Sequence, residues 1–251
     1  ATCFVQKTGR HDSGSGLEGR DCLVGCILKG GGGLYSRLVV GAVVLAAGEG
    51  RRLGSVPKSL IEIAGVPIIK RQLIALSGAG VDELVVVTGY YSEQVEAEIA
   101  GFPITITRNT ELENSTQGTS LELGLSALTG KLDAIVVVPS DMPLLGTQDY
   151  TDLIGAYKKR PDGVNLLRPV IGNRLGNPVI FDRGLLESDE TVDKRPLCRR
   201  RWTENPEQCF AWETDNDRYC IDLDTEEDVV NIEHRLGQKL KIPALGVLPF
   251  V

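Results

Sequence analysis

The feature that most constrains this chain is a continuous apolar run, Val39–Ala46, which leads directly into a loop of small residues, Ala47–Gly54. A run without polar alternation is typical of a parallel strand that is buried on both faces of its sheet. Glycine and alanine in the following loop let backbone N–H groups approach an anion closely. Arg52 and Lys58 add positive charge, so this strand end is predicted to cradle phosphate.

Beyond this loop, apolar runs of strand length alternate with segments of helical periodicity. This alternation predicts a three-layer α/β fold, in which helices cover both faces of a mostly parallel sheet. Ligands of such sheets bind beyond the carboxyl ends of the strands, where both the loop and Asp141 are expected to lie. The later strands are expected at Glu83–Thr88, Ile104–Thr107, Ala134–Val138, Asn177–Phe181 and Arg218–Leu223. The helices are expected to start at Pro67, at a Ser92 cap, at Gly118, at a Thr147 cap and at a Thr225 cap.

Composition narrows the classes of function. The 251 residues carry a formal net charge of −7, and no broad basic cluster interrupts this acidic balance. An acidic chain of this kind argues against nucleic acid as a partner. No apolar stretch approaches the length of a membrane span, and we expect a cytoplasmic protein without a membrane partner. The cysteines show no metal-finger spacing and are expected to be reduced thiols.

Residues 1–38 differ in composition from the rest of the chain. They are rich in glycine, including the run Gly30–Gly33, and contain few apolar residues in any regular period. The glycine run is not preceded by a strand or followed by the lysine of a phosphate loop. We therefore expect an N-terminal extension over 1–38 and the working domain over 39–251.

Other phosphate-binding loops fit the first loop poorly. The spacing Gly48-x-Gly50-x-x-x-Gly54 is one residue longer than the dinucleotide fingerprint, and the second strand ends in Thr88-Gly89 rather than in an acid. The Gly-Lys-Ser/Thr sequence of a Walker loop is absent. Two arginines and a Pro-Lys pair in one loop suit the several negative charges of a nucleoside triphosphate.

This loop resembles the signature of nucleotidyltransferases with a GT-A-like, Rossmann-type fold. Four later stretches make the chain similar to the molybdenum-cofactor nucleotidylyltransferases, and to their cytidylyl branch more than to the guanylyl one, in which L-A-G-G is typical where this chain has Leu45–Gly48. The stretches are Asn109 with Gly118–Leu121, Val136–Leu145, Gly176–Val179 and Asp222–Asp228. The chain departs from the pattern at Ser140, Asn177 and Glu226, where Gly, His and Pro are usual.

The resemblance implies a chemistry and a set of roles. A phosphate oxygen of the acceptor would attack the α-phosphorus of CTP, and pyrophosphate would leave in line. Arg52 would clamp the pyrophosphate, Lys58 would bridge the α-phosphate and the leaving oxygen, and Asp141 would hold Mg²⁺ together with Asp222 or Asp224. Substrate contacts are expected from Leu45, Ala46, Ala47, Gly48, Gly50, Gly54, Thr88, Gly89, Asn109, Ser120 and Asn177.

Several alternatives stay open at this stage. Ser120 is expected either to bind the nucleotide or to cap its own helix, whereas Arg51 is expected to face solvent and Tyr90 to pack or line a rim. The implied acceptor is a molybdopterin-type cofactor, with a molybdenum hydroxylase apoenzyme as a further partner. A sugar- or alcohol-phosphate nucleotidyltransferase would keep the same fold. A non-catalytic chaperone for the molybdenum cofactor is the alternative from a different class.

Overall fold

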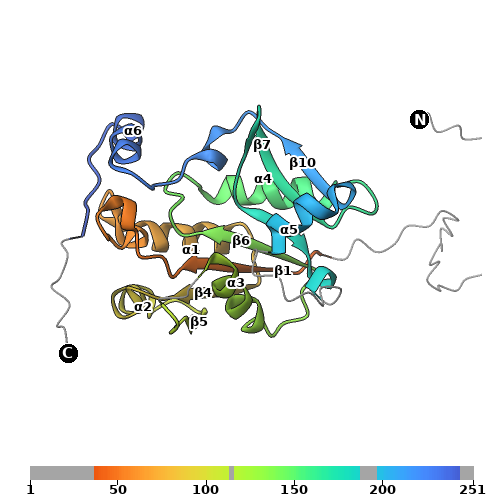
Figure 1. Ribbon diagram of the computed structural model, residues 1–251, viewed down its shortest axis with the longest axis horizontal. Helices are drawn as coiled ribbons and strands as arrows, with labels where there is room; N and C mark the ends of the chain where they lie inside the picture. Colours follow the sequence, from red (N-terminus) through yellow and green to blue (C-terminus); the bar gives the residue numbers. More distant parts are fainter. Residues whose placement is uncertain (1–36, 113–115, 187–196, 244–251) are drawn as a thin grey trace, which may run out of the picture. The chain divides into compact units, whose positions relative to one another are not determined.

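The computed structural model describes residues 37–112, 116–186 and 197–243, which belong to one compact unit, 37–251. Strands and helices alternate along this unit (Figure 1). The strands are β1 (Val40–Ala46), β2 (Glu62–Ile63), β3 (Val66–Pro67), β4 (Glu83–Thr88), β5 (Thr105–Arg108), β6 (Ala134–Pro139), β7 (Leu166–Ile171), β8 (Arg174–Leu175), β9 (Val179–Asp182) and β10 (Cys209–Glu213). The α-helices are α1 (Ile68–Gly78), α2 (Ser92–Ile99), α3 (Gln117–Ser126), α4 (Thr147–Lys158), α5 (Leu197–Glu204) and α6 (Glu226–Leu236), and the 3-10 turns are η1 (Arg51–Leu53), η2 (Lys58–Leu60), η3 (Arg183–Leu186), η4 (Pro206–Gln208) and η5 (Asp217–Cys220).

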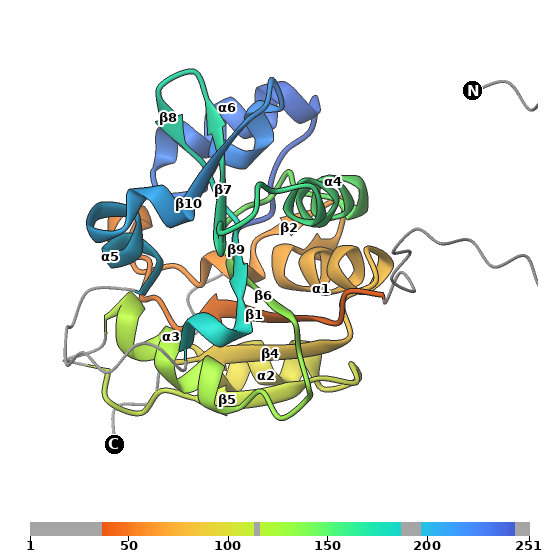
Figure 2. The ribbon, with the colours of Figure 1, turned by 90° about the vertical axis from the view of Figure 1, so that its right-hand side faces the viewer.

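Eight of the described strands form one mixed sheet in the order β10-β7-β9-β6-β1-β4-β5, with β8 paired to β7. The central strands β6, β1, β4 and β5 run parallel to one another, whereas β9 is antiparallel to both of its neighbours. Figure 2 shows β4 and β5 in the lower half of the view and β7 and β10 in the upper half. The prediction of a mostly parallel three-layer α/β fold is confirmed.

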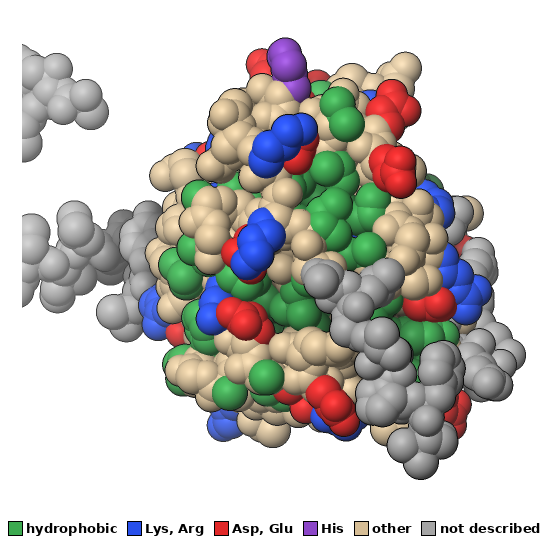
Figure 3. All heavy atoms as spheres, turned by 90° about the vertical axis from the view of Figure 1, so that its left-hand side faces the viewer, with side chains coloured by type: hydrophobic (Ala, Val, Ile, Leu, Met, Phe, Trp, Pro, Cys, Tyr) green, Lys and Arg blue, Asp and Glu red, His purple; other side chains and the backbone are tan. Residues whose placement is uncertain are grey.

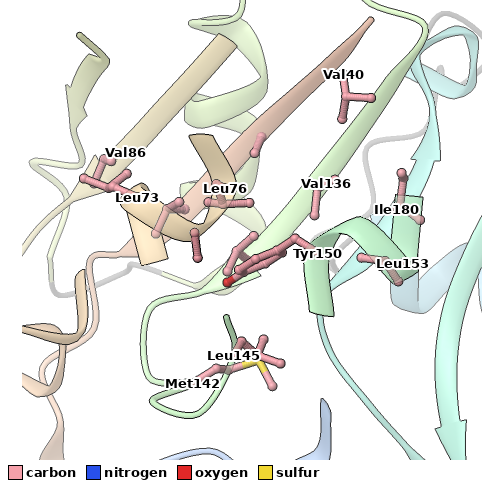
Figure 4. Packing of buried hydrophobic residues seen from close by; sticks show 14 of the residues in the cluster. Val40, Leu73, Leu76, Val86, Val136, Met142, Leu145, Tyr150, Leu153 and Ile180 are labelled. Atoms are coloured by element: carbon pink, nitrogen blue, oxygen red, sulfur yellow. The ribbon is translucent and has the colours of Figure 1, made fainter. Parts of the chain in front are cut away.

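The sheet is buried on both faces because its strands alternate between two apolar clusters. Ala42 and Val44 of β1 pack with Leu73 and Leu76 of α1 and with residues of α2 and α4. Figure 4 shows part of this cluster, including Leu76 of α1 and Leu153 of α4. Val43 points to the opposite face, into the cluster that contains Leu121 and Leu125 of α3. Period-two alternation between two apolar layers explains why β1 reads as a continuous apolar run.

A third apolar cluster holds the loop after β1 against the C-terminal part of the described chain. Leu53 and Val56 of the loop, at 6% and 7% exposure, pack in it with Ile61 and Leu223 and with residues of α6. Thr225 caps α6 by a reciprocal capping box with Asp228, and Gly237 ends this helix in the left-handed region at φ 65°. The predicted cap, span and end of this helix are confirmed.

Other predictions of local structure are wrong. Arg218–Leu223 is not a strand, because η5 occupies Asp217–Cys220 and the following residues extend without a ladder partner. Ser92 and Thr147 are the first residues of their helices rather than caps; Tyr91 precedes α2 without a side-chain cap, and the backbone N–H of Gly146 bonds Asp149 at the start of α4. The strands β7 and β10 were not predicted.

The predicted N-terminal extension, 1–38, lies outside the described residues except for its last two positions. Three of the cysteines predicted to be reduced thiols, Cys3, Cys22 and Cys26, fall there as well, whereas Cys198, Cys209 and Cys220 are free thiols. Within the described ranges, every helix is too short or too polar to cross a membrane.

Candidate functional site

Three strands bring the candidate site together at one edge of the sheet. β1 lies between β4 and β6 and is parallel to both, so Ala46, Thr88 and Pro139 mark neighbouring carboxyl ends. The chain leaves β1 toward β4 on one side and reaches β6 on the other. Such a reversal of strand order opens a crevice in which α/β sheets bind ligands.

The loop after β1 is a compact double turn with a close internal contact. The carbonyl of Gly50 accepts the N–H groups of Leu53 and Ser55 at 3.0 and 3.1 Å. Gly50 has φ 71°, and a Cβ there would lie 2.2 Å from the carbonyl oxygen of Val56. Only glycine fits this position, because a side chain would meet backbone in a conformation that already disfavours it. Gly48 differs, since a Cβ there would meet open space.

A cavity of about 440 Å³ lies against this loop. Its walls come from the ends of β1 and β6, the loop itself and the first turn of α3. Lys58 and Asp141 both line it. The predicted substrate contacts that also line it are Leu45, Ala46, Ala47, Gly48, Gly50 and Ser120.

Charged side chains form a network beside the cavity. The Lys58 ammonium contacts the Asp224 carboxylate directly and lies 3.6 Å from that of Asp141. A guanidinium nitrogen of Arg52 lies 2.6 Å from the other Asp224 oxygen. Lys58 is 15% exposed and Arg52 is 71% exposed, so Lys58 is the enclosed member of the network. Figure 3 views the side on which α6 and the loop after β1 lie in Figure 1, and acidic and basic side chains stand side by side there.

Asp141 holds its proton more strongly than a free aspartic acid. Burial raises the pKa of its carboxyl group to about 6, and the charges of Asp222 and Asp224 act in the same direction, while the Lys58 ammonium opposes them. The Asp141 carboxyl group is thus removed from water and feels other negative charges nearby. A carboxylate in such surroundings is ready to accept further positive charge.

The two aspartates at the end of the chain lie differently. Asp224 meets Lys58 and Arg52, whereas Asp222 is exposed and lines a separate groove with Arg174 and Arg235. Its influence on Asp141 is by charge at a distance. The structure therefore brings together Arg52, Lys58, Asp141 and Asp224.

The donor set fits a divalent cation that shares its ligands with phosphate. Asp141 and Asp224 both approach the same ammonium, so their oxygens face one small volume. Among residues 37–112, 116–186 and 197–243, no group of three or more His, Cys, Asp or Glu side chains converges as a metal site. Mg²⁺ needs only one or two carboxylates when substrate phosphates and water complete its octahedron.

The remaining predicted contacts lie away from this cavity and have structural partners. Thr88 is fully buried and donates to Glu96 at 2.7 Å. A Cβ at Gly89 would lie 2.6 Å from the carbonyl oxygen of Ala47, so this glycine lets β4 approach the loop. The side-chain amide of Asn109 donates to the hydroxyl of Ser120 at 3.1 Å and thereby tethers the first turn of α3. Gly54 is outside the lining, with φ 76°.

Sequence reasoning missed part of the lining. Arg51 was expected to face solvent, and although its side chain is 75% exposed it lies along the cavity, paired with Glu49. Tyr90 was expected to pack or line a rim, and its hydroxyl donates to the Leu112 carbonyl at 3.2 Å across the far end. The direction in which a loop side chain turns depends on the folded loop, so no periodic signal marks these residues. The lining residues that were not among the predicted contacts are Glu49, Arg51, Ser59, Leu112, Thr116, Gln117, Pro139 and Ser140, while Tyr90 lines the cavity as a rim residue would.

A second cavity of about 430 Å³ adjoins the first, and Leu45, Gln117 and Pro139 line both. Asn177, which was expected among the substrate contacts, lies in this second wall. Its described lining combines apolar side chains with the guanidinium of Arg168 and the polar residues Gln117, Asn177 and Thr203, and none of the described lining residues is acidic. Trp202 is half-buried here.

Comparison with known families and curated proteins identifies relatives over most of the described chain. The family described as MobA-like NTP transferase domain matches residues 42–208. The bifunctional protein GlmU of Acetivibrio thermocellus is 28% identical over 154 residues, which cover 61% of this chain and 32% of that protein. A second GlmU, from Mycolicibacterium vanbaalenii, is 32% identical over 166 residues, covering 62% and 34%. The chain thus spans about a third of the length of these curated relatives.

Solved structures share the fold. A nucleotidyl transferase from Methanothermobacter thermautotrophicus (Mth528) superposes with a TM-score of 0.65 at 23% identity, covering 79% of this chain and 97% of that one. The 4-diphosphocytidyl-2C-methyl-D-erythritol synthase of Anaerococcus prevotii superposes with a TM-score of 0.60 at 16% identity, covering 80% of this chain and 97% of that one. The manganese complex of Rv0371c from Mycobacterium tuberculosis superposes with a TM-score of 0.57 at 19% identity, covering 77% of this chain and 97% of that one.

Proposed function

Because the chain belongs to the MobA-like NTP transferase domain family, we propose that it transfers CMP from CTP to a phosphate-bearing acceptor and releases pyrophosphate. The observation that carries this proposal is the network in which Lys58 and Arg52 share the Asp224 carboxylate, with Asp141 at 3.6 Å from Lys58. Two cations and two carboxylates beside a backbone cradle supply what a triphosphate and a divalent cation require together.

The reaction needs no covalent intermediate on the enzyme. An oxygen of the acceptor phosphate forms a bond to the α-phosphorus, the bond from that phosphorus to the bridging oxygen breaks, and pyrophosphate leaves with the electron pair. Backbone N–H groups of Ala47–Gly50 hold the outer phosphates, and Arg52 neutralises the departing charge. Lys58 lies deepest and bridges the α-phosphate and the leaving oxygen.

Asp141 and Asp224 are the residues that would hold Mg²⁺, and the cation would neutralise negative charge on the α- and β-phosphates. In the apoprotein the Lys58 ammonium compensates both carboxylates. Phosphate oxygens and these carboxylates therefore compete for the same lysine. We propose that Lys58 turns from the carboxylates to the phosphates when the nucleotide binds. A solved structure with this fold is a complex with manganese, which supports a divalent ion as a ligand of this chain.

The second cavity supports an acceptor subsite next to the nucleotide. Leu45, Gln117 and Pro139 line both cavities, so an acceptor bound in the second would lie beside a triphosphate bound in the first. We propose a molybdopterin-type acceptor, since apolar side chains beside the guanidinium of Arg168 and polar groups such as Asn177 suit a polar ring system that carries an anionic group. Cytidylyl transfer is supported by the likeness of the fold to that of a diphosphocytidyl-methylerythritol synthase. The corresponding partner protein would be a molybdenum hydroxylase apoenzyme, which would receive the cytidylylated cofactor.

The test is pyrophosphate release by the full chain with Mg²⁺, each of the four nucleoside triphosphates, and a panel of acceptors. We expect release with CTP and a molybdopterin-type acceptor. Equal turnover with GTP would refute the cytidylyl preference, and turnover with only a sugar or alcohol phosphate would replace the acceptor. A protein that binds the cofactor and releases no pyrophosphate under any combination would be a carrier, and Asp141→Asn would leave its delivery intact.

A further inference from the structure

Asp149 is a fully buried acid that belongs neither to the cavity nor to any motif considered above. Its side chain is 1% exposed, near the start of α4. A buried charge is tolerated only where hydrogen-bond donors compensate it. Three donors do so at 2.7 Å each: the backbone N–H of Gly146, the side-chain amide of Asn216 and the guanidinium of Arg218.

Two of these donors come from a distant part of the chain, the segment 216–219, which we call the clip. Tyr219 of the clip is 1% exposed, and its hydroxyl donates to the backbone carbonyl of Asp149 at 2.6 Å. One residue of α4 thus holds the clip through both its carboxylate and its carbonyl group. Charge-assisted bonds in a buried setting are the strong kind.

The clip leads within a few residues to the charged network. Leu223 is fully buried, and its N–H donates to the carbonyl of Asp141 at 2.9 Å. Asp224 follows and meets Lys58 and Arg52. No regular structure spans 221–225, so the position of Asp224 is set by anchors on either side. The clip and the buried Leu223 hold the chain before it, and its own N–H donates to the Asp228 carboxylate of the α6 capping box at 3.1 Å.

The clip also supports the wall of the second cavity. The N–H of Asn177 donates to the carbonyl oxygen of Tyr219 at 2.8 Å. At the neighbouring Gly176 a Cβ would lie 2.8 Å from the same oxygen, so the two backbones touch. Asn177 then presents its side chain to the second cavity.

We propose that Asp149 is a positioning residue that sets, through the clip, both the place of Asp224 beside Lys58 and that of Asn177 in the wall of the second cavity. The inference rests on the proposed function in so far as Asp224 holds a divalent cation. A single buried carboxylate then aligns the metal side and the acceptor side of the reaction. Outer groups that orient a metal ligand typically change metal affinity or activity by about 10- to 100-fold when removed.

A purely structural role is the competing explanation, since Asp149 also closes the capping box of α4 through Gly146. Asn216 and Arg218 contribute nothing to that box. Substitution on the clip side therefore separates the two roles. Arg218 is 41% exposed, so a shorter side chain at this position stays in contact with water. Arg235 offers a matched control. Arg235 is 42% exposed and pairs with Asp217 in the same turn, yet makes no contact with Asp149.

The experiment measures Mn²⁺ binding by electron paramagnetic resonance in the presence of an α,β-methylene analogue of CTP, for wild type, Arg218→Gln, Asp149→Asn and Arg235→Gln. We expect Mn²⁺ affinity to fall about tenfold in Arg218→Gln and Asp149→Asn and to stay within about twofold in Arg235→Gln. CTP affinity measured in EDTA should not fall, and it should rise to the extent that a displaced Asp224 releases Lys58 and Arg52 for phosphate. In turnover, kcat should fall while KM for CTP is kept, and Arg218→Lys should recover part of the loss.

The inference is overturned if Arg218→Gln and Asp149→Asn both bind Mn²⁺ as wild type does. Lower melting temperatures with unchanged Mn²⁺ affinity would indicate that Asp149 acts only as a helix cap. Equal losses in Arg218→Gln and Arg235→Gln would also overturn it, because the effect would then be general loosening of this turn. Failure of wild type to release pyrophosphate with any acceptor would refute the proposed function instead. The Mn²⁺ titration would still decide the role of Asp149 in that case.

Discussion

The two halves of the charged network are built in different ways. The loop after β1 carries Arg52 and Lys58 within a few residues of a strand end, and its own turns hold it, as the 3.0 and 3.1 Å bonds to Gly50 show. Asp224 instead sits in a segment without regular structure, anchored by contacts to Asp149 and Asp141 far away in the sequence. Cations are thus supplied by local structure and the second carboxylate by tertiary structure. Each half responds to different substitutions.

The largest effect is expected in the local half. Lys58→Gln should lower turnover by about 10² to 10³, because it removes a preorganised charge at the reacting phosphate. Steady-state pyrophosphate release measures this loss. Lys70→Gln is the control, since Lys70 pairs with Glu98 on the surface at 2.5 Å and should leave turnover unchanged. Wild-type rates in Lys58→Gln would remove the lysine from the chemistry.

The next effect separates the two late aspartates. Asp224→Asn should lower turnover by about 10- to 100-fold, whereas Asp222→Asn should change it by less than about threefold, because only Asp224 meets Lys58 and Arg52. Without metal, Asp224→Asn should bind CTP more tightly than wild type, since Lys58 and Arg52 are then released for phosphate. Calorimetric titration in EDTA checks this, and weaker binding would contradict the competition.

The apoprotein should lose stability at neutral pH through Asp141. Its pKa in the folded state, about 6, lies above the ordinary value of 3.8, so the folded protein favours the protonated form. That contribution is complete below about pH 4 and is lost as the pH rises through 6. Asp141→Asn should therefore be more stable than wild type at pH 7.5 in EDTA, by about 1 to 3 kcal/mol. The difference between the two proteins in free energy of unfolding, measured with urea, should shrink at pH 4.5. A difference that stays constant with pH would exclude titration of Asp141 as its cause.

The smallest effect concerns the helix that follows Asp224. Thr225→Ala removes a capping hydroxyl and should cost about 1 kcal/mol, while Thr147→Ala, at the first residue of α4, should cost less than about 0.5 kcal/mol. Chemical denaturation of both variants measures the pair. Equal losses would show that Thr147 caps α4 after all.

Much of the fold could be predicted because its signals are local. The unbroken apolar runs of β1 and β6 indicate strands buried on both faces, and the Thr225 cap and Gly237 end of α6 follow from side-chain and backbone chemistry within one turn. No local signal gives the antiparallel direction of β9, because the direction of a strand depends on the neighbours with which it pairs. No local signal of comparable strength marks β7 and β10 either. The turn η5 was taken for a strand since Arg218–Leu223 is apolar enough for either structure.

By itself the sequence determined the parallel core, the loop after β1 and the aspartate that follows β6, because each depends on short-range chemistry at a strand end. Tertiary structure alone decided which late aspartate meets Lys58, that Arg51 lies along the cavity, and that Asn177 belongs to a second cavity. These outcomes depend on contacts between residues far apart in the chain, such as the 2.7 Å bond from Asn216 to Asp149. Sequence spacing carries no information on such distances until the chain has packed.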